Sequence, residues 1–112
     1  MTPLQVAVQV LVSLLATGQF EVAAAMTRSD RLSADALREA VARYGRTLVA
    51  LPIEALQHLD VVEVEGREHP TFHVVVDLWT ADEGRSDLSL ELELIDRYGG
   101  AFETRILDLH VL

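Results

Sequence analysis

Two runs of alternating residues in the second half of the chain constrain its fold more than any other feature. The first run spans residues 72–79 and the second spans residues 87–94, with a short polar segment between them. Every second residue is apolar, so each run predicts a β-strand with one buried face. The buried faces are expected to hold Phe72, Val74, Val76, Leu78, Leu88, Leu90, Leu92 and Leu94.

The first half of the chain has helical spacing instead. A very apolar helix is expected from Pro3 to about Thr17, a short one over residues 20–26, and a third over residues 33–45. The first and third follow a Thr or Ser cap, and each is followed by a glycine that can end it. A last helical turn is expected over residues 52–56. Residues 27–31 are polar and are interpreted as a loop.

Two further strands complete the expected sheet. One begins at Asp60, and the last runs over residues 101–112. The last strand changes phase, and a β-bulge near Ile106 and Leu107 would reconcile its two halves. The prediction is a single α+β domain over residues 1–112. Three to four N-terminal helices would pack on one face of a curved four-stranded antiparallel meander.

Composition excludes several classes of function. The chain has no Cys and no Lys, which rules out thiolate metal sites, Cys nucleophiles and Schiff-base chemistry. Its net charge is −9, the opposite of what a protein that tracks nucleic-acid phosphates or anionic lipid needs. An acidic protein can instead attract a basic partner protein.

The N-terminal apolar segment does not have the features of a targeting signal. It spans residues 4–16, is too short to cross a bilayer, and has no basic region before it. The expected localisation is therefore cytoplasmic.

The order of these elements resembles a known superfamily. The segment from Leu11 to Tyr44, with Thr17–Glu21 and Leu32–Leu37 within it, is similar to the opening of the nuclear-transport-factor-like cone domains, which include SnoaL-like proteins. The resemblance implies a cone-like sheet, a pocket that can bind a small molecule or act as an isomerase, and dimers formed through the sheet. Residues 77–87 also resemble small uncharacterised bacterial domains.

The outward face of the predicted sheet is the first candidate site. If Leu78 lies opposite Leu88, then His73 faces Glu93, Val75 faces Glu91 and Trp79 faces Asp87, with Arg105 near Glu91 or Glu93. A histidine beside a carboxylate can act as an acid–base pair, although a solvated face with ordinary ion pairs is the simpler explanation of the pattern. Trp79 and its apolar neighbours favour an interface. The residues expected to bind a partner are His73, Val75, Trp79, Glu91, Glu93 and Arg105.

Other chemistry finds little support. An isomerase-like site needs a carboxylate base and a hydroxyl donor in an apolar pocket, and the only candidates are Tyr44 and, if the bulge turns it inward, Asp108. The four histidines lack the spacing of a zinc pair, and the acidic loop from Asp82 to Asp87 does not match a calcium loop. No metal and no cofactor are expected.

Three hypotheses remain. The first is a non-enzymatic acidic protein-binding module of bacterial type, immunity-like or regulatory, that forms a homodimer through the outer sheet face. The second is a small-molecule-binding or isomerase-like pocket protein of the cone fold. The third is an accessory module of a larger system, without activity of its own.

Overall fold

The structure is a computed structural model that describes residues 1–27 and 31–111. Within these residues the chain forms an α+β fold with four helices and an open five-stranded antiparallel sheet. The helices are α1 (Pro3–Ala16), α2 (Phe20–Thr27), α3 (Ala34–Tyr44) and α4 (Ile53–Gln57). The strands are β1 (Leu48–Val49), β2 (Asp60–Val64), β3 (Thr71–Thr80), β4 (Gly84–Asp96) and β5 (Phe102–Val111).

The N-terminal helices form where local signals start and stop them. Thr2 caps α1 in a reciprocal capping box with Gln5, and the Ser33 side chain accepts a hydrogen bond from the backbone N–H of Ala36 at the start of α3. Gly45 ends α3 in the left-handed conformation at φ 75°. The predicted helices of the first half are thus confirmed, whereas the predicted loop includes residues 28–30, which lie outside the described part of the chain.

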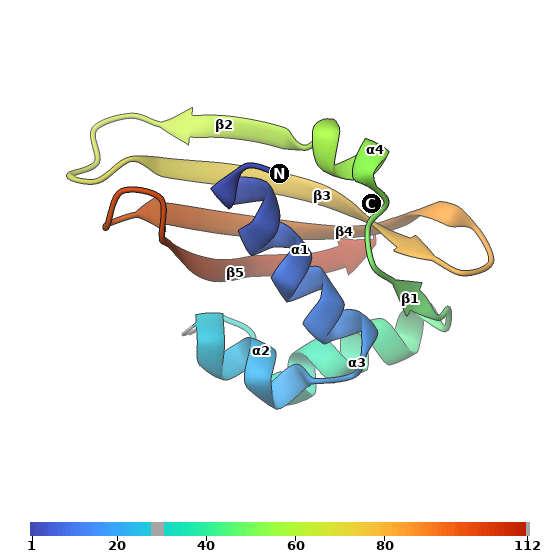
Figure 1. The fold of residues 1–112 in the computed structure, drawn as a ribbon. Coiled ribbons are helices and arrows are strands. Elements are labelled where there is room, and N and C mark those ends of the chain that lie inside the picture. The colour runs from blue at the N-terminus through green and yellow to red at the C-terminus, as the bar shows by residue number, and fades with distance from the viewer. Residues whose placement is uncertain (28–30, 112) are drawn as a thin grey trace.

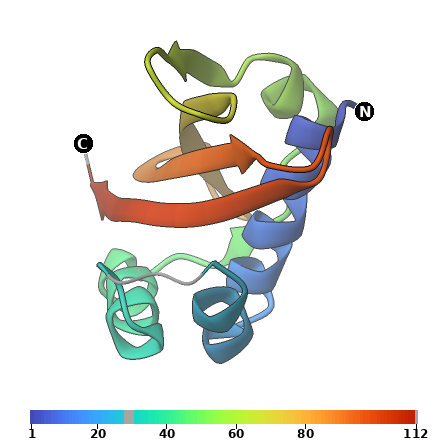
Figure 2. The same ribbon diagram turned by 90° about the vertical axis from the view of Figure 1, so that its left-hand side faces the viewer.

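The helices cover one side of the sheet. Helix α1 crosses its front, while α2 and α3 lie below it and pack against β5 (Figure 1). In Figure 2, α1 runs along one side of the sheet, and the C-terminal end of β5 lies on the other. We call the side that faces α1 the inner face and the opposite side the outer face.

The core lies between α1 and the inner face. The alternation predicted for β3 and β4 is confirmed, because all these positions are buried except Phe72, which is half-buried. The buried residues of these two alternating runs are Val74, Val76, Leu78, Leu88, Leu90, Leu92 and Leu94. They meet four side chains from α1, namely Val8, Leu11, Val12 and Leu15. Burial of these apolar surfaces is the main stabilising contribution to such a layered domain.

The sheet has one more strand than predicted. The four long strands form the expected meander β2-β3-β4-β5, but β1 pairs with the end of β3 through Leu48 and Val49. A two-residue strand is too short to show an alternating pattern, so no sequence pattern indicated it.

The bulge predicted in the last strand is confirmed. Glu91 pairs with Asp108 and Leu92 pairs with Ile106, which leaves Leu107 as the extra residue. One inserted residue restores the correct face on both sides of the bulge, so Ile106 and Leu109 are both buried.

A polar stripe on α1 positions the segment around α4. The Gln9 side chain donates a hydrogen bond to the backbone carbonyl of Leu51 at 2.7 Å and accepts one from its N–H at 3.0 Å. Gln5 donates to the carbonyl of Leu56 at 3.0 Å. These side-chain hydrogen bonds satisfy backbone groups that have no strand partner, and they hold α4 against the edge of the sheet.

Candidate functional site

One edge of β3 has no neighbouring strand for three residues. β2 pairs with Thr71–Val75 and β1 pairs with Trp79–Thr80, so neither covers Val76–Leu78. Helix α4 lies beside this gap, between β1 and β2 in Figure 1. A helix cannot continue the ladder of a sheet, so the gap leaves room beside β3.

A cavity of about 480 Å³ occupies this position. Its volume falls within the range of small-ligand sites, which runs from about 300 to 1,000 Å³. Its apolar wall comes from the end of α4 and from β3, and consists of Ala55, Leu59, Val75, Val76 and Trp79. The cavity therefore opens where the outer face meets the edge of the sheet.

The polar wall of the cavity is mostly acidic. Glu54 from α4, Asp60 from β2 and Asp77 from β3 face a single Arg85 from β4, and His58 also contributes. The Nε atom of Arg85 lies 4.0 Å from an Asp77 carboxylate oxygen, and the Arg85 side chain is 73% exposed. This ion pair is loose and solvated, so it neutralises Asp77 only weakly.

Gly84 lies close to Trp79, one of the residues of the cavity wall. A Cβ on Gly84 would lie 3.4 Å from Cζ3 and 3.7 Å from Cε3 of the Trp79 ring, and Gly84 has a φ of +74°. A Cβ at this position would lie in ordinary van der Waals contact with the indole, while the left-handed backbone would be strained. Gly84 thus lies beside the Trp79 ring at the start of β4.

The six residues predicted to bind a partner all lie on the outer face. His73 is the cross-strand partner of Glu93, Val75 is the partner of Glu91, and Arg105 is the partner of Glu93, as the expected register requires. Val75 and Trp79 also line the cavity. The structure therefore brings the predicted face and the cavity together into one continuous surface.

One predicted pairing is wrong. Trp79 lies opposite Arg85 rather than Asp87, because the β3–β4 ladder shifts register between Asp77 and Trp79. The hydroxyl of Ser86 donates a hydrogen bond of 2.7 Å to the Leu78 carbonyl in the irregular stretch. The shift moves a cation, instead of a carboxylate, next to the indole.

Two histidines of the outer face lie near the Glu91 carboxylate. The His73 Nε2 atom lies 3.6 Å from one of its carboxylate oxygens, and the His110 Nε2 atom lies 4.0 Å from the other. Glu93, which directly faces His73, is 3.5 Å from Arg67 instead. The carboxylate beside the His73 imidazole is therefore that of Glu91, its diagonal neighbour, rather than that of Glu93 as predicted. The His73 and Glu91 side chains are each about one-third exposed.

Ser89, His110 and Asp108 are the residue types of a catalytic triad, but the serine is not accessible to a substrate. Asp108 Oδ2 lies 3.0 Å from His110 Nδ1, and Ser89 is the cross-strand partner of His110. Ser89 is fully buried, and its hydroxyl has no hydrogen-bond partner among the described residues. A nucleophile must reach its substrate, so this arrangement does not support acyl transfer.

The two pocket candidates do not share a cavity. Asp108 is half exposed and lies on the outer face beside His110, because the bulge does not turn it inward. The Tyr44 hydroxyl donates to the Glu83 carboxylate, 2.9 Å away, and accepts a hydrogen bond from the backbone N–H of Asp87 at 3.3 Å. Tyr44 thus fastens α3 to the β3–β4 turn.

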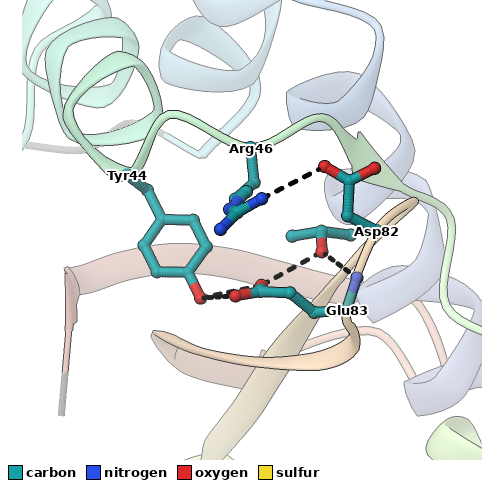
Figure 3. Close-up of polar contacts among 5 residues, drawn as sticks. Tyr44, Arg46, Asp82 and Glu83 are labelled. Carbon is teal, nitrogen blue, oxygen red and sulfur yellow. Dashed lines mark hydrogen bonds and ion pairs between the residues drawn. The ribbon is translucent and has the colours of Figure 1, made fainter.

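Figure 3 shows this junction. Tyr44 points toward Glu83, and Arg46 points toward Asp82, whose carboxylate is 3.4 Å away. Thr80 donates to Glu83 at 3.0 Å and accepts from its backbone N–H at 3.1 Å. The carboxylates of Asp82 and Glu83 are thereby engaged in fixing the turn.

Hydrogen bonds and ion pairs shift the pKa values of Arg97, Glu21 and Arg38. The hydrogen bond that Arg97 donates to Glu103 at 2.5 Å raises the pKa of the Arg97 guanidinium. A backbone hydrogen bond and the Arg38 side chain lower the pKa of Glu21, and Glu21 in turn raises the pKa of Arg38. The first ion pair joins the β4–β5 turn to β5, and the second joins α2 to α3.

Sequence reasoning missed most of the charged cavity wall. Glu54, His58, Asp60 and Arg85 come from three separate elements and form no motif in the sequence. The only local sign was Trp79, a large aromatic residue at a position predicted to point outward.

Among the described residues, no cluster of ligands suited to a metal ion is present. No helix in this part of the chain is long and apolar enough to cross a membrane.

Comparison with known proteins identifies one related family. The sequence profile of a family described as Domain of unknown function (DUF7668) matches residues 12–112. The chain belongs to the DUF7668 family. The DUF7668 match begins within α1 and includes all of the outer face and the whole cavity wall. No curated protein and no solved structure matches the chain.

Proposed function

We propose that this DUF7668 protein is a non-enzymatic binding module that recognises a basic segment of a partner protein. The observation that carries the proposal is the acidic cavity beside Trp79, which opens onto an outer face rich in carboxylates. Trp residues in partly desolvated pockets frequently anchor protein interfaces. An immunity-like or regulatory role, in which the partner is another bacterial protein, is consistent with this surface.

The charge of the outer face supports a basic partner. The strands place six carboxylates on it, from Asp60, Asp77, Glu91, Glu93, Glu103 and Asp108. Four arginines accompany them: Arg85 and Arg105 from the strands, and Arg67 and Arg97 from the turns. The face therefore has an excess of negative charge within a chain of net charge −9, which steers positively charged segments toward it.

Peptide binding tests the proposal. A fluorescent decapeptide of alternating Arg and Ser should bind with increasing fluorescence anisotropy, and a Glu-Ser decapeptide should not. Because the attraction is electrostatic, raising NaCl from about 50 to about 500 mM should weaken binding. Absence of binding by the basic peptide at low salt would contradict the proposal.

A matched pair of variants separates site binding from net charge. Glu91→Gln with Glu93→Gln removes two charges from the outer face, while Asp35→Asn with Glu39→Gln removes two charges from α3. We expect the first double variant to weaken peptide binding several-fold, by the loss of close charge pairs, and the second to leave it nearly unchanged. Equal losses in both would mean that the peptide responds only to overall charge.

Self-association is a second candidate, favoured by the apolar residues of the same face. Val62 on β2 is 57% exposed and is the cross-strand partner of His73; Val75 and Trp79 lie farther along β3. A homodimer through the outer face would cover these side chains.

The resemblance to cone-fold proteins suggests a small-molecule pocket as the alternative function. The volume of the cavity favours it, but the cavity lies at the edge of β3 rather than between α3 and the inner face. No Tyr44–carboxylate pair lines it.

A further inference from the structure

The cavity at the β3 edge has the chemistry of a site for one positively charged side chain. Glu54, Asp60 and Asp77, from three different elements, line it together with Arg85 and His58. Three carboxylates around an apolar wall repel an anionic ligand and leave a neutral one without charge partners. A cation is the complementary occupant.

We infer that this cavity is a subsite that accepts a single arginine side chain from the basic segment of the partner. The inference rests on the proposed function and specifies where and how one residue of that segment is held. The side chain would enter between α4 and β3, with its guanidinium group at Asp77 and its aliphatic stem along the apolar wall.

Trp79 distinguishes arginine from other cations. A planar guanidinium stacks on an indole and gains a cation–π attraction, and its fork of N–H donors matches a carboxylate with two bonds. A lysine ammonium is a compact and strongly hydrated charge that does not stack in this way. The cavity therefore favours arginine over lysine.

The Arg85 guanidinium is already the cation nearest to Asp77, but the interaction between them is weak. Its Nε atom is 4.0 Å from Asp77, too far for a hydrogen bond, and nearly three-quarters of its side chain is exposed. An incoming guanidinium takes over Asp77, and Arg85 swings into solvent. Arg85 thus competes with the ligand, which leads to an unusual expectation: its removal strengthens binding.

The single tryptophan of the chain provides the measurement. N-acetyl-arginine amide, titrated into the full chain, should change the Trp79 emission and saturate. N-acetyl-lysine amide should bind more weakly, and N-acetyl-citrulline amide, which has the same shape without the charge, should produce no saturable change. Citrulline amide binding as well as arginine amide would overturn the inference.

Three variants test the assignment of residues. Asp77→Asn should weaken arginine amide binding about tenfold, the factor that corresponds to about 1.4 kcal/mol, and Arg85→Gln should strengthen it several-fold. Glu63→Gln, on β2 outside the cavity, serves as the control with an equal change of charge. An unchanged affinity in Asp77→Asn, or a weaker one in Arg85→Gln, contradicts the subsite.

The outcome also separates this inference from the proposed function. If the arginine decapeptide binds but neither it nor arginine amide perturbs Trp79, the outer face binds basic segments and the subsite inference is wrong. If neither probe binds, the proposed function fails together with the inference.

Discussion

Gly84 has a left-handed backbone, and a Cβ there would touch the Trp79 ring in ordinary van der Waals contact. Gly66, in the turn between β2 and β3, has a similar φ of +78° but no atom within 4 Å of where a Cβ would lie. The two glycines therefore separate the effect of the backbone conformation from the effect of the contact.

The effect of alanine at each glycine follows from this difference. We expect Gly66→Ala and Gly84→Ala each to lower the free energy of unfolding by about 1 kcal/mol, the usual cost of a left-handed L-residue. Only Gly84→Ala should shift the Trp79 emission, because only its new methyl group touches the indole. Urea denaturation and emission spectra measure both, and an unchanged spectrum in Gly84→Ala would show that Gly84 does not contact the indole.

Strand β5 shows how an element resolves a conflict in its own sequence. If alternation ran unbroken back from Leu109, Leu107 would point inward and Ile106 outward. The bulge reverses this, so that Ile106 is 1% exposed and Leu107 is half-buried. The same extra residue keeps Asp108 and His110 on the outer face with Glu91.

Two neighbouring substitutions test the bulge. Ile106→Ala should lower the free energy of unfolding by about 2–5 kcal/mol, because it leaves a cavity in the core, whereas Leu107→Ala should cost less than about 1 kcal/mol. Thermal or urea denaturation measures the difference. The reverse order of the two losses would indicate a regular strand without the bulge.

At the scale of the whole molecule, the homodimer that we propose would form through the outer face, which lies opposite α1. If two copies associate through this face, multi-angle light scattering should give twice the mass of the chain. Trp79→Glu should shift the protein to the monomer, because it puts a buried charge into the contact. Val6→Glu, on the exposed side of α1, is the control and should leave the dimer intact. A strict monomer that Trp79→Glu does not change contradicts the homodimer.

The sequence alone predicted the helices, the two faces of β3 and β4, and the bulge in β5. These features depend on periodicity and capping within single segments, so the pattern of neighbours contains them. It also placed His73, Val75, Trp79, Glu91, Glu93 and Arg105 on one face, because side chains alternate along a strand. The pairing of His73 with Glu91 rather than Glu93 depends on rotamers and lay beyond that pattern.

Only the tertiary structure decided where the cavity lies. It exists because β1 and β2 both pair with β3 and leave three of its residues uncovered, and because Gln5 and Gln9 of α1 hold α4 beside the gap. Asp60 and Arg85 meet there from segments 25 residues apart in the chain. Alternation is a local property that a sequence contains, but convergence of separate elements depends on packing across the whole fold.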